Sequence, residues 1–309
     1  MCGRVIPASP RLPKRGPRPQ LVLIAMLFFL LAACSAAPGG HEAAPRSNDS
    51  RNATAATTAP TTTTTVVPTT TTIAPTTQPP RPEGSRPAMP PTPQDLQPLF
   101  GKVWQQIPTA SRVVALTFDA GANGNGVRAI LAILRSAGVA ATFFLTGAFT
   151  RSFPDLARSI AFDGYRIGDH TVDHPHLPSL SDAMVASEVA DAAATITSVT
   201  GASPSPLFRF PYGNSDGRTL AQVNDLGYVA VGWTIDTLGW EGSSAGITPA
   251  SIVARVMAGL RPGEIVLMHV GSNPSDGSTL DADALASVIG SIKAAGYSFV
   301  TLDALLGKG

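Results

Sequence analysis

Two histidines spaced four residues apart are the first candidates for chemistry in this sequence. His170 and His174 are the ends of the segment HTVDH, and on helically turned backbone such residues lie one above the other. This spacing suits two adjacent ligands of a zinc-like ion. The same pair could instead be loop or helix-capping histidines. Asp169 and Asp173 lie close by in the sequence and are expected to orient the ring N–H groups, which favours the metal site.

An aspartate and an arginine lie in segments that are typical of buried strands. Asp119 follows the apolar run VVALTF and precedes a glycine-containing loop, so it is either a general base or the cap of the next helix. Arg209 lies inside the hydrophobic segment LFRF, where an unpaired guanidinium would be costly. It therefore needs a carboxylate partner, and we expect that partner to be Asp119.

Two further side chains follow apolar runs. His269 ends the run IVLM and is either a second proton-transfer group or a core histidine with satisfied ring nitrogens. Trp240 comes four residues after Asp236 and either stacks against a sugar ring or simply packs.

The elements that carry these residues alternate between strands and helices. The predicted strands are 113–118, 141–145, 165–167, 207–210, 228–235, 265–268 and 298–302, and the predicted helices are 127–137, 155–162, 182–200, 219–226, 248–260 and 283–295. Strict alternation predicts an α/β fold with a parallel sheet, either a barrel or a doubly wound sheet. The carboxyl ends of such strands meet at one face, where we expect Asp119, His170, His174, Arg209, Tyr212, Asp236, Trp240 and His269 to gather.

The composition narrows the class of protein. A chain of 309 residues, 44% of them hydrophobic, can bury a large core. A net charge of +1 argues against a nucleic-acid-binding protein. Two cysteines cannot form a disulfide framework or a four-thiolate zinc site, so a metal would be held by histidines and carboxylates.

The amino terminus is typical of a secretory signal. Basic residues precede the apolar run 21–33, which is too short to span a bilayer core of about 30 Å, so we expect residues 1–33 to be a signal peptide. The segment ends in LAAC, which resembles a bacterial lipobox and implies that Cys34 is lipidated; alternatively, the signal is cut nearby and Cys34 is incidental. The Thr/Pro-rich residues that follow Cys34, up to residue 95, are predicted to be a disordered tether, which leaves residues 96–309 as the folded domain.

Five segments, taken in order, resemble the five motifs of the polysaccharide deacetylases, also called the NodB-type domain or carbohydrate esterase family 4. TFDAG (117–121) resembles the family's TFDDG, HTVDH its HxxxH, RFPY (209–212) its RxPY, DTLGW (236–240) its DxxDW, and LMH (267–269) its LxH. The resemblance covers about residues 110 to 305. It implies a distorted (β/α) barrel of about seven βα units with parallel strands, in agreement with the strand count.

The resemblance also implies a chemistry, the metal-assisted hydrolysis of an acetyl group on an N-acetylated sugar. His170 and His174 would hold a divalent metal, with zinc expected first and cobalt or another transition metal as alternatives. Asp119 would take the proton of the attacking water while Arg209 keeps it ionised, and His269 would protonate the departing amine. The backbone N–H of Tyr212 would help hold the oxyanion. The remaining motif residues, expected to orient the substrate or the catalytic groups, are Pro211, Asp236, Trp240 and Leu267.

Two positions depart from the family's motifs. The second aspartate of the family's first motif is a metal ligand, and Ala120 stands in its place, which should weaken metal binding. Asn123, Asn125 or Asp173 are the candidates to replace it. Gly239 stands where the family has the aspartate that tunes the acid histidine, so either Asp236 takes that part or His269 titrates near its ordinary value.

Three functions remain open from the sequence. The first is a metal-dependent deacetylase of a cell-wall glycan such as peptidoglycan. The second is a weak or inactive glycan-binding protein that lost its metal through Ala120, and the third is a related hydrolase of an O-acetyl ester or another amide. The expected partners are an acetylated glycan and, through Cys34, the outer face of the cell membrane, with a monomeric protein and no nucleic acid.

Overall fold

The computed structural model describes residues 93–307. The chain divides after Pro80, and all the described residues belong to the second unit, Arg81–Gly309. The predicted signal peptide 1–33, the lipidation site Cys34 and nearly all of the predicted tether lie outside the described residues. Among residues 93–307, no helix combines the length and the apolar character needed to span a membrane.

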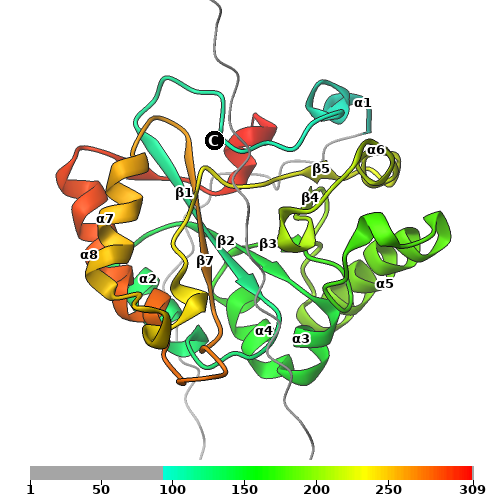
Figure 1. Ribbon diagram of the computed structural model, residues 1–309. Coiled ribbons are helices and arrows are strands. Elements are labelled where there is room, and N and C mark those ends of the chain that lie inside the picture. Colours follow the sequence, from blue (N-terminus) through cyan, green and yellow to red (C-terminus); the bar gives the residue numbers. More distant parts are fainter. Residues whose placement is uncertain (1–92, 308–309) are drawn as a thin grey trace, which may run out of the picture. The chain divides into compact units, whose positions relative to one another are not determined.

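Parallel strands form one central sheet, with helices on both sides of it in the view of Figure 1. The strands are β1 (Val113–Ala120), β2 (Ala141–Leu145), β3 (Arg166–Asp169), β4 (Leu207–Phe208), β5 (Val229–Ala230), β6 (Ile235–Asp236), β7 (Glu264–His269) and β8 (Ser298–Phe299). Their order is β5-β4-β3-β2-β1-β7-β6, and β8 pairs with β1 outside this path. The α/β fold and its distorted (β/α) barrel are thus confirmed.

The prediction of one strand over residues 228–235 is wrong. The structure places β5 beside β4 and β6 beside β7, so this short segment supplies both edges of the sheet. Between β5 and β6 the chain crosses from one edge to the other, and the Arg209 guanidinium donates to the carbonyls of Val231 (3.3 Å) and Gly232 (3.0 Å). An apolar run cannot reveal such a crossing, because a buried bridge has the same composition as a buried strand.

Each of the six predicted helices agrees with an observed helix to within three residues at each end. They are α1 (Pro93–Leu96), α2 (Val127–Ala137), α3 (Gly147–Ser152), α4 (Pro154–Phe162), α5 (Asp182–Thr200), α6 (Gly217–Asp225), α7 (Pro249–Gly259) and α8 (Leu280–Ala294). The sequence did not indicate α1, α3 or the short 3-10 helices η1 (Gln97–Leu99), η2 (Leu177–Ser179), η3 (Pro211–Gly213), η4 (Gly239–Glu241), η5 (Ser243–Ala245) and η6 (Leu302–Leu306). The α8 helix begins earlier than predicted, which brings Asp281 into its first turn.

Local signals explain where several helices begin and end. The Ser181 hydroxyl accepts the Met184 N–H at the start of α5, and Asp216 forms a capping box with Thr219 at the start of α6. Gly138 closes α2 with φ +61°, a left-handed conformation that glycine adopts without a side-chain penalty.

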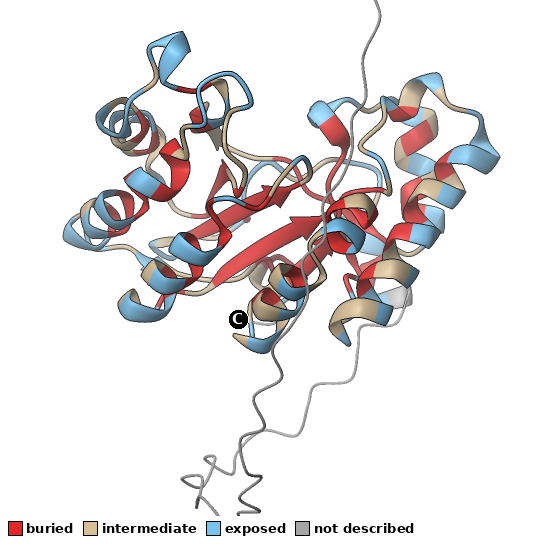
Figure 2. Ribbon diagram, turned by 90° about the horizontal axis from the view of Figure 1, so that it is seen from below, coloured by how far each residue is buried: buried red, intermediate tan, exposed pale blue. Residues whose placement is uncertain are grey.

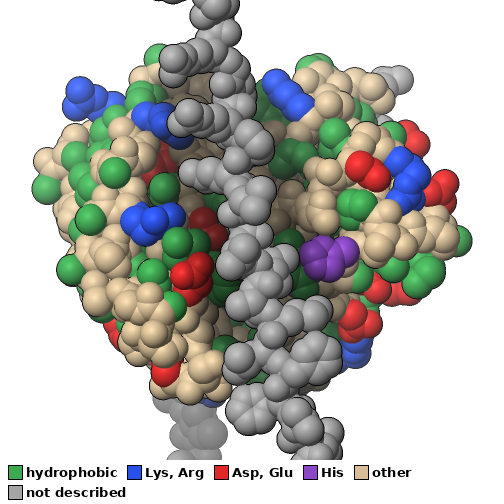
Figure 3. Space-filling view, viewed as in Figure 1, with side chains coloured by type: hydrophobic (Ala, Val, Ile, Leu, Met, Phe, Trp, Pro, Cys, Tyr) green, Lys and Arg blue, Asp and Glu red, His purple; other side chains and the backbone are tan. Residues whose placement is uncertain are grey.

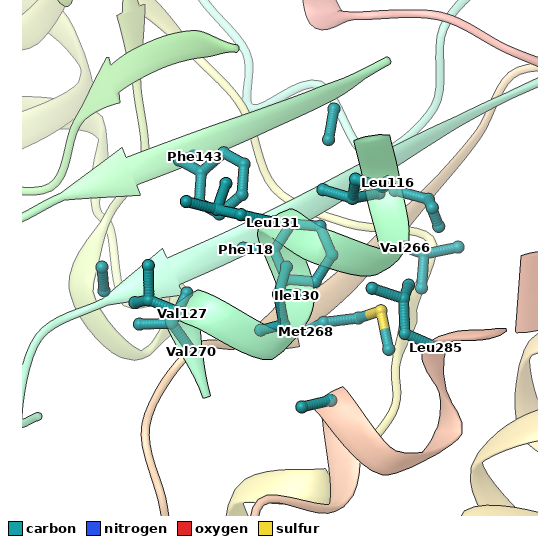
Figure 4. Close-up of a cluster of buried hydrophobic side chains, with 14 of the residues drawn as sticks. Leu116, Phe118, Val127, Ile130, Leu131, Phe143, Val266, Met268, Val270 and Leu285 are labelled. Atoms are coloured by element: carbon teal, nitrogen blue, oxygen red, sulfur yellow. The ribbon is translucent and has the colours of Figure 1, made fainter. Parts of the chain in front are cut away.

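Alternation along the strands separates two layers of packing. The strands are buried between the helices, as Figure 2 shows from below. Side chains that face the helices form the main core, in which Phe118 and Phe143 stack with centroids 4.9 Å apart and Leu131, Met268 and Leu285 pack around them (Figure 4). Inward-facing residues alternate with these along β1 and β7, so Asp119 and His269 face the opposite side of the sheet from Phe118 and Met268.

Candidate active site

A cavity of about 620 Å³ lies at the carboxyl ends of the strands. The predicted site residues that line it are Asp119, His170, His174, Tyr212, Asp236, Trp240, Leu267 and His269. The other two, Arg209 and Pro211, are buried beside it. The structure therefore brings all ten predicted residues of the domain to one place. Figure 3 shows one face of the molecule, on which basic and acidic side chains are interspersed and histidine reaches the surface.

Asp119 is held at the end of β1 by a buried arginine. Arg209 is fully buried, and its Nη1 donates to Asp119 Oδ1 at 2.7 Å. The guanidinium also lies 4.1 Å from the centroid of the Phe144 ring. Burial alone would raise the pKa of Asp119, but the charge and hydrogen bond of Arg209, together with the neighbouring imidazoles, outweigh it and hold the pKa below its ordinary value. The carboxylate is therefore ionised and fixed in orientation.

His170 presents one ring nitrogen to this carboxylate. Its Nδ1 lies 2.8 Å from the backbone carbonyl of Arg209, which can only accept, so Nδ1 carries the proton. Nε2 then has a free lone pair and lies 3.4 Å from Asp119 Oδ2. Two acceptors that face each other in this way need a proton, a water or a cation between them. The expected orientation of the ring by Asp169 or Asp173 is wrong, because the carbonyl of Arg209 makes this contact.

The loop that joins His170 to His174 is held at several points. Thr171 and His174 have positive φ angles of 67° and 60°, which are rare for residues other than glycine. Asp169 Oδ1 accepts the Thr171 N–H at 2.8 Å, and Glu188 Oε2 on α5 accepts the N–H groups of the two residues that follow, at 2.9 and 3.1 Å. Burial and the neighbouring His170 lower the pKa of His174 to about 4, so its ring is neutral at pH 7.

His269 lies directly beside Asp119 on the neighbouring strand. The two residues are register partners of the β1–β7 pair, so their side chains point to the same face of the sheet. Burial alone would lower the pKa of His269, but the carboxylates of Asp281, Asp119 and Asp236 outweigh it and raise the pKa. The cavity thus contains an ionised carboxylate next to an imidazole that readily carries a proton.

Aromatic rings form the exposed part of the cavity wall. Tyr212 is 60% exposed, and its ring stacks on His176 with centroids 4.1 Å apart and an angle of 11° between the planes. Trp240 is 48% exposed and its Nε1 donates to Asp236 Oδ2 at 3.3 Å. Exposed aromatic faces with a polar edge are suited to contact a sugar ring.

The donor set fits an ion held by two imidazoles. His170 and His174 meet with ring centroids 4.7 Å apart, and the free Nε2 of His170 faces the cavity carboxylate. No set of three His, Cys, Asp or Glu residues within 93–307 is arranged to hold a metal. Ala120 is fully buried in the main core, and its side chain does not line the cavity. The residues fit an ion completed by solvent and do not fit one with three protein ligands.

The candidate replacement ligands mostly have other roles. Asn123 Oδ1 accepts the Ser272 N–H at 2.8 Å, and Asn125 Nδ2 donates to the Ser272 hydroxyl at 2.8 Å, so both asparagines tie down the loop after β7. Asp173 does line the cavity and lies 3.6 Å from Arg151.

Two residues that contact the site were missed from the sequence. Glu188 is in the middle of a helix and Asp281 lies near the start of one, positions at which acidic residues are ordinary. The one signal for Asp281 is that it follows the His269 strand closely at a helix start, where an aspartate usually indicates a cap.

Comparison with known proteins agrees with the motif resemblance. The family model for polysaccharide deacetylase matches residues 106–231, which include Asp119, both metal-candidate histidines and the RFPY segment. The peptidoglycan-N-acetylglucosamine deacetylase of Bacillus cereus is 32% identical over 192 residues, which cover 62% of this chain and 67% of that protein.

Solved structures give the same result. The Bc1960 peptidoglycan N-acetylglucosamine deacetylase is 28% identical, with a TM-score of 0.62, over 71% of this chain and 98% of its own. BA3943 from Bacillus anthracis, a carbohydrate esterase family 4 pseudoenzyme, is 26% identical, with a TM-score of 0.58, over 63% of this chain and 66% of its own. With the fold, the five strand-end motifs and these relatives in agreement, the chain belongs to the polysaccharide deacetylase family, carbohydrate esterase family 4.

Proposed function

We propose that this protein is a hydrolase that removes acetyl groups from N-acetylated sugars of a cell-wall polysaccharide such as peptidoglycan. The observation that carries the proposal is the pairing of Asp119 and His269 on adjacent strands, in one cavity, with the carboxylate ionised and the pKa of the imidazole raised. Amide hydrolysis needs a base for water and an acid for the leaving nitrogen. The relatives named above include a peptidoglycan-N-acetylglucosamine deacetylase.

The residues of the cavity divide the reaction between them. Asp119 takes a proton from water, and the resulting hydroxide adds to the acetyl carbonyl carbon. The carbon–nitrogen bond then breaks, its electron pair stays on nitrogen, and His269 gives that nitrogen a proton, so acetate and a free amino sugar leave. His170 and His174 would hold a divalent ion, zinc in the first instance, which would supply polarisation of the carbonyl and a lower pKa of the water.

The substrate is proposed to lie between the two exposed aromatic residues. Tyr212 and Trp240 offer ring faces to the sugar, and Asp236 orients Trp240 through its indole N–H. Tyr212 has φ 59° and ψ 9°, a conformation that η3 holds and that fixes the direction of the backbone N–H proposed to bind the oxyanion. Pro211 stiffens this turn, and Leu267 provides part of the apolar wall.

Acetate release is the direct test of this proposal. Purified protein with added zinc or cobalt is incubated with peptidoglycan and with chitooligosaccharides, and the products are identified by mass. We expect acetate release that chelator removes and that falls at least about 100-fold in Asp119→Asn, which lacks the base, and in His170→Ala. Asp155→Asn, an exposed carboxylate outside the cavity, is the matched control for the loss of a negative charge. Acetate release that survives both site substitutions would exclude the mechanism.

Inactive glycan binding is the second candidate function, and Ala120 is the observation that favours it. Ala120 offers no ligand atom where the family has an aspartate, and BA3943 is itself a pseudoenzyme. Elemental analysis decides between the two functions. Protein without bound metal, without activity after metal addition and with retained glycan binding would support the second. A chromogenic acetyl ester cleaved much faster than N-acetyl oligomers would instead indicate an O-acetyl esterase.

We also propose that the domain acts outside the cytoplasm, attached to the outer face of the membrane. The support is the sequence of the amino terminus, with its signal-like residues 1–33, the lipobox-like LAAC and the Thr/Pro-rich tether up to residue 95. Labelling cells with a radioactive fatty acid tests the anchor. Label should enter the protein and be lost in Cys34→Ser, which should also move from the membrane to the soluble fraction; label that persists in Cys34→Ser would exclude this anchor.

A further inference from the structure

Gly239, in the turn before Trp240, leaves room for a carboxylate from elsewhere in the chain. A Cβ atom at Gly239 would lie 2.4 Å from Oδ1 of Asp281 and 2.8 Å from Oδ2, closer than real Cβ atoms approach other atoms. Gly239 is buried, and its φ is not among the positive values of the chain. The backbone conformation therefore does not require glycine at position 239. Glycine is needed there because the Asp281 carboxylate occupies the space that a side chain would take.

The Asp281 carboxylate lies in that space and hydrogen-bonds to the end of β7, which carries His269. It lies in the first turn of α8 and is 3% exposed. Oδ1 accepts the Thr237 hydroxyl at 2.6 Å, and Oδ2 accepts the backbone N–H of His269 at 2.7 Å. The same Oδ2 lies 3.8 Å from Nδ1 of the His269 ring. Within residues 93–307, this imidazole is the basic side chain that lies nearest to the Asp281 carboxylate in an ion-pair arrangement.

The two nitrogens of His269 have different surroundings. Nδ1 is buried and has no hydrogen-bond acceptor among the described residues, so the nearby carboxylate is the group that stabilises a proton on it. The ring lines the cavity, so Nε2 is the nitrogen that can reach a substrate. Asp236 does not hold the ring in place, because its Oδ1 accepts the Leu238 N–H at 2.9 Å and its Oδ2 accepts the Trp240 indole N–H.

We propose that Asp281 is the positioning residue of His269. It fixes the backbone of His269, keeps the Nδ1–H toward α8, and favours the imidazolium that donates its Nε2 proton to the leaving nitrogen. This inference rests on the proposed function for its effect on catalysis, but the contact between Asp281 and His269 exists without it. The other titratable groups that face His269 are Asp119 on β1, Asp236 on β6, and His170 and His174 in the loop after β3.

The test measures the pKa of His269 by NMR and the kinetics of acetate release in metal-replete protein. In Asp281→Asn, which keeps the size of the side chain, the pKa of His269 should fall by about one unit. The limb of the kcat profile that reports the proton donor should move to lower pH by the same amount, and kcat should fall at least about tenfold with KM nearly unchanged. Asp283→Asn is the matched control, because Asp283 is exposed in the same helical turn.

Additional variants keep the inference open to refutation. Gly239→Ala places a methyl group against the Asp281 carboxylate and should also lower the pKa of His269. This variant serves as the test if Asp281→Asn does not fold. The double variant Gly239→Asp/Asp281→Ala moves the carboxylate to the facing position and should restore part of kcat. An unchanged pKa of His269 together with an unchanged kcat in a folded Asp281→Asn protein would overturn the inference. Wild-type protein that releases no acetate would refute the proposed function alone, because the NMR titration still tests the contact.

Discussion

Replacement of Arg209 should destabilise the domain more than neutralisation of its partner Asp119. Arg209→Met leaves the buried Asp119 carboxylate without its cation, which costs about 3–5 kcal/mol. It also removes the donors to the carbonyls of Val231 and Gly232, and each buried unsatisfied acceptor costs about 1–3 kcal/mol. The total is at least about 5 kcal/mol, comparable with the whole folding free energy of many domains, about 5–15 kcal/mol.

Asp119→Asn keeps an oxygen that can accept from Nη1, and Arg209 keeps its two backbone acceptors. Its cost should stay near the low end of the range for a broken buried pair, about 3 kcal/mol. For a domain of this size, about 2–4 °C is lost per kcal/mol, so Arg209→Met should lower Tm by roughly 10 °C or more. Because the pKa of Asp119 is lowered in the folded state, its contribution is present above the unfolded pKa of about 4 and is lost as the pH falls further.

Urea unfolding followed by tryptophan fluorescence and circular dichroism measures these differences. Arg158→Met is the matched control, since Arg158 lies 2.8 Å from Asp155 with both side chains exposed, and it should change the unfolding free energy by less than about 1 kcal/mol. The gap between wild type and Asp119→Asn should also narrow below about pH 4. The reasoning is refuted if Arg209→Met is no less stable than Asp119→Asn, because the donors to the bridge between β5 and β6 then contribute nothing.

Two further predictions concern acidic residues outside the cavity. Glu264 is fully buried with both carboxylate oxygens unsatisfied, and burial raises its pKa to about 7. Since this folded pKa exceeds the unfolded one, the free energy of unfolding should fall as the pH rises from about 4.5 to 7. Glu264→Gln should flatten this dependence and be more stable than wild type at pH 8 in urea titrations. Glu188→Ala removes the acceptor of the Val172 and Asp173 N–H groups, so acetate release should fall at least about tenfold. Glu188→Gln keeps a carbonyl oxygen and should retain most of the activity. Equal activity of the two Glu188 variants would argue against a role for this contact.

The amino-acid sequence alone was enough to predict the class of fold and the face at which the candidate site residues lie. Hydrophobic alternation indicated parallel strands joined by helices, and the position of polar residues at the ends of apolar runs indicated one active face. Arg209 in an apolar segment required a carboxylate, and the structure has Asp119 in contact with it. These inferences succeed because they depend on burial patterns and on local spacing, both of which can be read from residues that are close together in the sequence.

The contacts between residues far apart in the chain could be seen only in the folded structure. The segment 228–235 was apolar enough to be one strand, and only the sheet order shows that it bridges two edges. Gly239 and Ala120 appeared in the sequence as two lost aspartates. The structure shows that they differ, because the space at Gly239 is filled by the Asp281 carboxylate, whereas the Ala120 methyl group packs in the apolar core. A side chain that the family has and this chain lacks can be replaced by any residue that folding brings near. The residues next to it in the sequence do not indicate which residue that is.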